Sequence, residues 1–88
     1  MYLHLGQNTV VAEDEIIGIF DMDNTTSSKW TRQFLMKAER EGRLINVSGD
    51  IPKSFVVCCG KNGMVAYLSQ LNTATLRQRA GTIFADLQ

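Results

Sequence analysis

The stretch MYLHLGQNTVVAEDEIIGIF, residues 1–20, decides the fold of this chain. Its apolar side chains fall into three short runs, at residues 2–5, 9–12 and 16–20, and polar or turn-forming residues separate the runs. Short runs that alternate in polarity or are rich in β-branched side chains are typical of strands. We therefore predict three β-strands within these residues.

A helix is predicted next, over residues 28–41, after a polar break at residues 21–28. Ser27 or Ser28 can cap it, because a serine oxygen accepts hydrogen bonds from the exposed amides of a first turn. Gly42 stands where a left-handed residue commonly ends a helix. The apolar residues that fall on one side of this helix are Trp30, Phe34, Leu35 and Ala38.

Further strands are predicted in the middle of the chain. Residues 44–47 favour a short strand, and residues 53–59 are apolar on both faces, which is typical of a central strand buried on both sides. Residues 60–63 contain Asn-Gly, which suits a tight hairpin, so residues 64–69 are expected to return as the partner strand.

A second helix ends the predicted fold. Asn72 or Thr73 is expected to cap it, and Gly81 weakens it by roughly 1 kcal/mol relative to alanine, so the helix is expected to break or end there. Its apolar stripe consists of Leu76, Ala80, Ile83, Phe84 and Leu87. The order β-β-β-α-β-β-β-α predicts one α+β domain over residues 1–88, with a mainly antiparallel or mixed sheet of about five to six strands, one central helix and a C-terminal helix.

The composition is that of a small globular domain. The chain has 88 residues, of which 44% are hydrophobic and 20% charged. A core of this size is modest, so we expect stabilisation by oligomerisation. There is no signal-peptide pattern and no apolar run long enough to span a membrane, which predicts a cytoplasmic protein. Cys58 and Cys59 are expected to be reduced, buried core residues, because neighbours in a strand point to opposite faces and cannot bridge each other.

Charge is unevenly distributed along a chain of zero net charge. Residues 1–28 carry five acidic residues and no Lys or Arg, whereas residues 29–88 carry all nine basic residues and four acidic ones, giving formal charges of −5 and +5. The separation has two interpretations. It is either an ordinary solvated surface, or the mark of a molecule with unlike faces, which favours head-to-tail contact between copies and closure into a ring.

One motif suggests catalysis. An apolar strand that ends in Asp21-Met22-Asp23-Asn24-Thr25 resembles the first motif of haloacid dehalogenase-type phosphatases, in which the two carboxylates serve as nucleophile and acid/base beside Mg²⁺. Those enzymes need a larger sheet and a later acidic pair, which this chain lacks, so we interpret the motif as a turn whose side chains bond local amides. We therefore predict no enzyme, no catalytic residue, no cofactor and no metal site.

Several segments together resemble the RemA/RemB-like family of bacterial extracellular-matrix (biofilm) regulatory proteins, most closely its RemB branch. They are Met1–Gly6 (MYLHLG), Val10–Asp21, Pro52–Val57 (PKSFVV) and Leu71–Ala80 (LNTATLRQRA). The resemblance implies a cytoplasmic DNA-binding transcriptional regulator with a sheet like that of LytTR-type DNA-binding domains. It also implies a ring-like homo-oligomer around which double-stranded DNA wraps.

The resemblance further implies DNA-binding arginines at positions where this chain differs. Asp50 and Ile51 follow Gly49 where an arginine pair is expected, and Glu15 stands at a third such position, while Lys53 keeps a base. Carboxylates repel phosphate, so phosphate contacts are expected from basic residues later in the chain. These are Lys29, Lys37, Arg40, Arg43, Lys53, Arg77 and Arg79.

An alternative hypothesis is a non-enzymatic oligomeric module that binds protein, for instance as the partner of a DNA-binding paralogous regulator. The charge separation and the small core motivate it. The phosphatase is a distant third hypothesis. The sequence favours the DNA-binding oligomer, and its neutral subunits need repetition to gather enough positive charge.

Overall fold

The computed structural model of this protein describes residues 2–6, 8–22, 29–47, 49–61 and 63–80. In chain order its elements are β1 (Tyr2–Gly6), β2 (Thr9–Ala12), the single 3₁₀ turn η1 (Glu13–Glu15), β3 (Ile16–Asp21), α2 (Lys29–Arg40), β4 (Leu44–Asn46), β5 (Ser54–Gly60), β6 (Gly63–Ser69) and α3 (Thr73–Ala80). The three strands predicted from the opening residues are confirmed, whereas η1 was not predicted.

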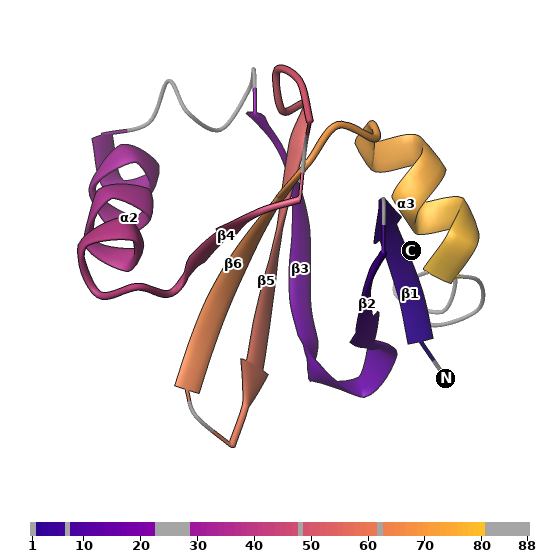
Figure 1. Ribbon diagram of the computed structural model, residues 1–88, viewed down its shortest axis with the longest axis horizontal. Helices are drawn as coiled ribbons and strands as arrows, with labels where there is room; N and C mark the ends of the chain where they lie inside the picture. Colours follow the sequence, from indigo (N-terminus) through magenta and orange to yellow (C-terminus); the bar gives the residue numbers. More distant parts are fainter. Residues whose placement is uncertain (1, 7, 23–28, 48, 62, 81–88) are drawn as a thin grey trace.

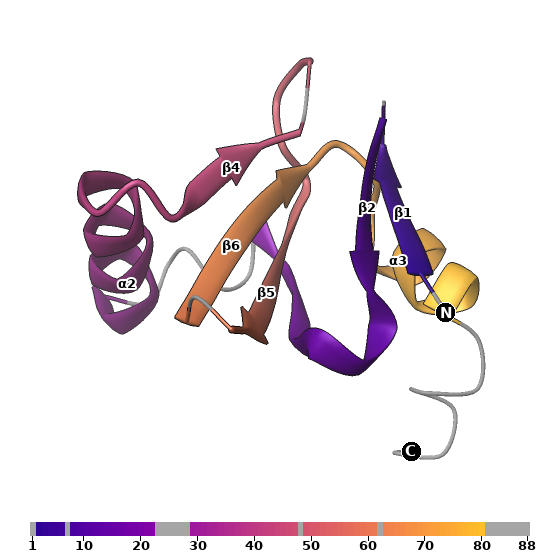
Figure 2. The ribbon, with the colours of Figure 1, turned by 60° about the horizontal axis from the view of Figure 1, so that its bottom comes forward.

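The strands form two sheets. β3, β5, β6 and β4 lie in that order in a four-stranded sheet, with β4 parallel to β6 and the other pairs antiparallel. β1 and β2 form a separate antiparallel pair. This pair and α3 lie on one side of the larger sheet, and α2 lies on the other (Figure 1, Figure 2). The predicted α+β class with a mixed sheet is confirmed, although its six strands divide between two sheets.

The main core fills the space between the larger sheet, the β1–β2 pair and α3. Its buried members are Leu3, Leu5, Val11, Ile19, Val47, Val56, Cys58, Leu76 and Ala80. Two fully buried serines donate side-chain hydrogen bonds to backbone carbonyl groups. Ser69 Oγ donates to the carbonyl oxygen of Leu5, and Ser54 Oγ donates to that of Leu71, both at 2.7 Å. Each hydroxyl therefore joins two segments that are distant in the sequence and gives a backbone carbonyl a side-chain partner.

β5 is the central strand that its sequence predicts. It lies between β3 and β6, and residues 54–58 are all buried. Val56 and Cys58 point into the main core, whereas Phe55 and Val57 point to the side of the sheet that carries α2. Both faces of β5 are therefore covered, which explains its continuous apolar run.

α2 ends where the sequence predicts. Gly42 has a φ of +72°, its N–H donates to the carbonyl oxygen of Glu39 at 3.1 Å, and the N–H of Arg43 donates to that of Ala38 at 2.7 Å. This is the paired-bond helix ending that a left-handed glycine permits. The capping serines proposed for the start of the helix, Ser27 and Ser28, lie outside the described residues.

The predicted apolar side of α2 is partly wrong. Ala38 is buried and Phe34 and Leu35 are half-buried, but Trp30 is 73% exposed and Thr31 is buried instead. α2 packs mainly on β4 and β6, at one edge of the sheet, so its first turn receives little cover from β3 and β5. The expectation for the cysteines is also partly wrong. Both are free, but only Cys58 is buried, because Cys59 points to the opposite face near the uncovered end of β5.

α3 begins as predicted, because the side-chain oxygen of Asn72 accepts a hydrogen bond from the N–H of Thr75 at 2.8 Å. Leu76 and Ala80 are the buried members of its apolar stripe. The remaining predicted members, together with Gly81, lie outside the described residues.

Candidate nucleic-acid interface

The outward side of α2 carries a cationic surface. Lys29, Arg32, Lys37 and Arg40 are all exposed, and we call them the α2 cationic face. Their spacing of three, five and three residues places them on one side of the helix, away from the buried Thr31. Sequence reasoning overlooked Arg32, although its position three residues after Lys29 on the same helix was a usable signal.

The charges of this helix are nearly all of one sign. Glu39 is the acidic residue within α2, and the first turn carries none. Lys37 and Arg40 lie in the last turn, where the negative end of the helix dipole stabilises cations. An anionic ligand on this side therefore meets a predominantly positive field.

Arg43 lies just beyond the helix, on the side that faces the sheet. Its guanidinium forms an ion pair with the carboxylate of Glu41. Arg43 and Lys37 line a hollow of about 210 Å³ between α2 and the sheet, together with Phe34, Ala38, Met64 and Ala66. Arg43 is thus a neighbour of the α2 cationic face, but part of its charge is already balanced.

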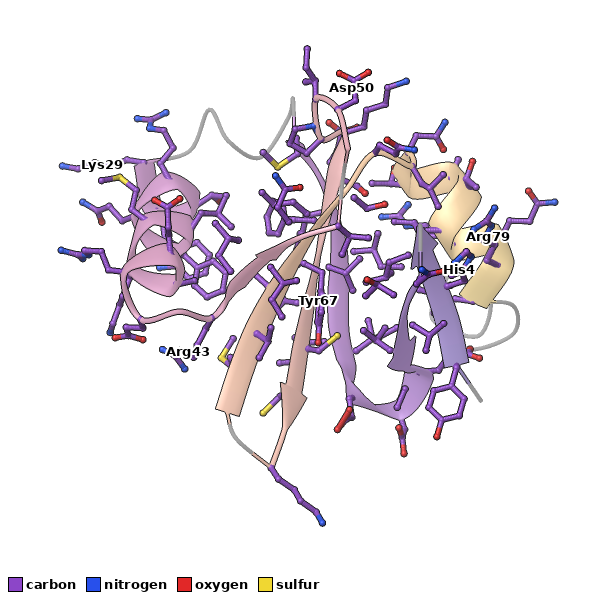
Figure 3. All side chains as sticks on the ribbon, in the orientation of Figure 1. His4, Lys29, Arg43, Asp50, Tyr67 and Arg79 are labelled. Carbon is purple, nitrogen blue, oxygen red and sulfur yellow. The ribbon has the colours of Figure 1, made fainter. Side chains whose placement is uncertain are left out.

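Lys53 lies away from α2. Its N–H donates to the carbonyl oxygen of Ser69 at 2.8 Å, and its own carbonyl oxygen accepts from the N–H of Met22 at 3.0 Å. These bonds fix the backbone at the start of β5 while the side chain stays exposed. Asp50 and Ile51 precede it, both exposed, at the opposite end of the sheet from the β5–β6 turn (Figure 3).

Arg77 and Arg79 lie on α3, on the other side of the molecule from α2. The structure thus brings together Lys29, Lys37, Arg40 and Arg43 among the predicted phosphate contacts, and separates them from the two arginines of α3 (Figure 3). Nη1 of Arg79 donates to the carbonyl oxygen of His4 at 3.3 Å, so this arginine also joins α3 to β1.

Acidic residues gather on the β1–β2 side. Glu13, Asp14 and Glu15 make up η1; Glu13 is buried and the other two are exposed. The predicted charge separation is therefore only partly a separation in space. α2 and η1 lie on opposite sides of the larger sheet, but Arg77 and Arg79 of the basic half lie on α3, on the same side as η1 (Figure 1, Figure 2).

This acidic region affects two neighbouring groups. Burial and, second, the nearby carboxylate of Glu15 raise the pKa of Cys58 from 9.0 to about 11. Burial, the Cys58 thiolate and Glu15 likewise raise the pKa of Tyr67. Both groups are therefore neutral at physiological pH.

Two candidate chemical sites were considered among the residues that the structure describes, a metal site and the phosphatase-like motif. Among those residues, no three His, Cys, Asp or Glu side chains come together as metal ligands. Asp21 ends β3, half-buried, and Asp23, the second carboxylate of the phosphatase-like motif, lies outside the described residues. Neither described helix is long and apolar enough to cross a lipid bilayer.

Comparison with known proteins identifies the family of this chain. The model of the RemA-like family, described as extracellular matrix regulatory protein A-like, matches residues 2–80. The chain is also 34% identical over 84 residues to extracellular matrix regulatory protein B of Bacillus subtilis (strain 168), covering 96% of this chain and 95% of that protein. The chain therefore belongs to the RemA-like family of extracellular matrix regulatory proteins.

Proposed function

We propose that this protein is a cytoplasmic, oligomeric DNA-binding transcriptional regulator of extracellular-matrix (biofilm) genes that contacts mainly the phosphate backbone. The observation that carries the proposal is the α2 cationic face, where Lys29, Arg32, Lys37 and Arg40 lie exposed on one side of a single helix. Membership in a family of extracellular matrix regulatory proteins supports a regulatory role.

The dimensions of α2 suit a polyanion. At 1.5 Å per residue, the helix places Lys29 and Arg40 about 16 Å apart along its axis. Duplex DNA carries one negative charge per roughly 1.7 Å of its axis, so basic side chains spread over that length reach several phosphates. Contacts of this kind position a protein on the duplex without reading base sequence.

The α2 cationic face also supplies positive charge that this chain lacks at other positions. At positions where the family resemblance implies arginines, this chain has Asp50, Ile51 and Glu15. Asp50 and Glu15 are exposed carboxylates and repel phosphate. We therefore assign the principal contacts to α2 and the neighbouring Arg43, and a separate contact to Lys53, which lies away from α2. Arg77 and Arg79 belong to a separate surface that reaches DNA only from another side of the subunit.

Oligomerisation completes the proposal. Each subunit is formally neutral, so one copy binds DNA weakly. A ring that repeats the α2 cationic face around its rim engages many phosphates at once, and linkage raises the overall affinity far above that of one subunit.

Fluorescence anisotropy of a labelled DNA duplex tests this proposal, in buffer of about 50 mM salt. The double variant Lys29→Glu/Arg40→Glu is expected to bind at least about tenfold more weakly than the unaltered protein, because two phosphate contacts per subunit become repulsive. Lys61→Glu is the matched control, since it reverses an exposed base at the β5–β6 turn, away from α2. An equal loss in both variants would contradict the role of α2, and no binding by the unaltered protein would contradict DNA binding itself.

A second function is favoured by the position of the acidic η1 on the side of the larger sheet opposite the α2 cationic face. A protein with unlike faces also suits an oligomeric interaction module that binds a DNA-binding paralogous regulator. That function predicts a defined multimer that does not shift duplex DNA at low salt, and that binds DNA only when the paralogue is present.

A further inference from the structure

The first turn of α2 exposes a large aromatic side chain. Trp30 is 73% exposed, although tryptophan is highly buried in most folded proteins. Its ring stacks on that of Phe34, with the ring centroids 5.9 Å apart and the ring planes 6° apart. These two parallel rings, which we call the aromatic platform, are therefore open to solvent at Trp30.

An open hollow of about 240 Å³ lies beside the aromatic platform. Its lining consists of Trp30, Gln33, Phe34 and Lys37. Residues at positions i, i+4 and i+7 share one side of a helix, so Trp30, Phe34 and Lys37 follow one line along α2. The hollow thus presents two aromatic rings, a side-chain amide and an ammonium group to a ligand.

The charges around the aromatic platform attract an anion. Lys29 precedes it and Lys37 follows it, and the side chain of Lys29 points outward from the helix (Figure 3). Glu39 is the acidic residue within α2, but it follows Trp30 by about two and a half helical turns and so lies on the opposite side of the helix. A ligand that combines a flat ring with negative charges therefore matches this site better than an uncharged one.

An unpaired base of DNA has these properties. Every base has an aromatic face, and its stacking on a protein side chain depends little on which base it is. In a duplex the faces of the bases are covered by their neighbours, so α2 meets mainly phosphates there. In a single strand, a base can lie on the ring of Trp30 while the phosphates on either side of it contact Lys29 and Lys37.

We propose that the aromatic platform stacks with an unpaired base of single-stranded or locally opened DNA, and that the flanking phosphates contact Lys29 and Lys37. Gln33 borders the same hollow, where its amide can donate to or accept from the edge of the base. The inference rests on the proposed DNA-binding function and extends it from phosphate contacts to a class of DNA in which a base is accessible. It also gives the exposed ring of Trp30 a binding role.

Intrinsic fluorescence tests the stacking directly, because Trp30 is the single tryptophan of the chain. A thymine oligonucleotide is expected to quench the emission of the unaltered protein as it binds, in buffer of about 50 mM salt. Inorganic polyphosphate supplies negative charges without bases, so it is expected to leave the emission nearly unchanged. Binding of the oligonucleotide without quenching, or equal quenching by polyphosphate, would overturn the stacking.

Substitutions of Trp30 separate stacking from a purely structural role. Trp30→Leu keeps an apolar side chain but removes the ring, so the affinity for a labelled thymine oligonucleotide, measured by anisotropy, should fall about tenfold, and that for a duplex less than about twofold. Trp30→Phe keeps a ring and should retain most of the affinity. Tyr2→Ala is the matched control, because Tyr2 is also 73% exposed but lies on β1. Equal losses for the oligonucleotide and the duplex in Trp30→Leu, or an equal loss in Tyr2→Ala, would overturn the inference.

The same measurements distinguish failure of this inference from failure of the proposed function. Duplex binding without quenching by the oligonucleotide contradicts only the stacking at the aromatic platform. Binding and quenching by the oligonucleotide, without any binding of the duplex, contradicts only a regulator that binds duplex DNA. Absence of binding to either form of DNA contradicts both.

Discussion

The guanidinium of Arg79 donates a 3.3 Å hydrogen bond to the carbonyl oxygen of His4 and so joins α3 to β1. This contact lies on the side of the molecule opposite α2 (Figure 3). Two cationic regions therefore lie on opposite sides of the molecule. That of α3 includes Arg79, which joins two elements, and that of α2 spreads along the outward side of a helix.

Replacing Arg79 with alanine is expected to affect stability more than DNA affinity. Loss of its hydrogen bond should lower the free energy of unfolding by about 0.5–1 kcal/mol, since the bond is exposed. Arg40→Ala should show the reverse pattern, with weaker DNA binding and nearly unchanged stability. Urea denaturation and DNA anisotropy on both variants provide the comparison; a larger affinity loss for Arg79→Ala would move the interface to α3.

Ser69 has a larger structural role than its size suggests. Its hydroxyl donates to the carbonyl oxygen of Leu5 at 2.7 Å and accepts from the N–H of Leu71 at 3.1 Å, and the residue is fully buried. Ser69→Ala leaves both groups without that partner, so the free energy of unfolding should fall by about 1–3 kcal/mol. Gln70→Ala, an exposed neighbour, is the control for urea denaturation and should change little. Equal effects would show that the buried bonds contribute nothing.

Substitutions of Gly42 test the left-handed ending of α2. Its φ of +72° disfavours any residue with a Cβ atom, although nothing lies within 4 Å of where that atom would be. Gly42→Ala is therefore expected to destabilise the protein by about 1 kcal/mol through backbone strain alone. Gly42→Asn should cost less, because asparagine tolerates this conformation better. Thermal denaturation followed by circular dichroism measures both, and an alanine variant as stable as the parent would contradict the strain.

Thiol alkylation should distinguish the two cysteines. Cys59 is exposed, whereas Cys58 is buried and has a pKa raised to about 11 by its burial and by Glu15. At about pH 8, only roughly one Cys58 in a thousand is a thiolate, so iodoacetamide should modify Cys59 alone. Because the reactive form is the thiolate, any Cys58 labelling should rise about tenfold per pH unit below that pKa. Peptide mass spectrometry reads out both sites, and equal labelling at about pH 8 would contradict the burial of Cys58.

The features that the sequence predicted correctly depend on local chemistry. The two-sided apolar run of β5, the left-handed Gly42 and the cap at Asn72 each follow from a few neighbouring residues. The same is true of the stripe of bases on α2, which needs only helical periodicity. These elements were therefore visible without any knowledge of how they pack.

The features that the sequence did not predict depend on tertiary placement. The exposure of Trp30 follows from α2 packing at one edge of the sheet, and that of Cys59 from its position near the uncovered end of β5. Periodicity identifies an apolar side of a helix but does not reveal how far the opposing sheet extends. Likewise, nothing local indicated that Lys29 and Arg79 would lie on opposite sides of the molecule.

The salt dependence of DNA binding by the unaltered protein tests the central claim most directly. Each phosphate contact contributes about −0.9 to the slope of log K against log salt, so two subunits with about three contacts each predict a slope near −5. We expect duplex DNA to be bound at about 50 mM salt and released steeply towards about 200 mM, with a shallower slope for Lys29→Ala/Arg40→Ala. No binding at about 50 mM salt, or a slope near zero, would contradict a phosphate-binding rim formed by α2.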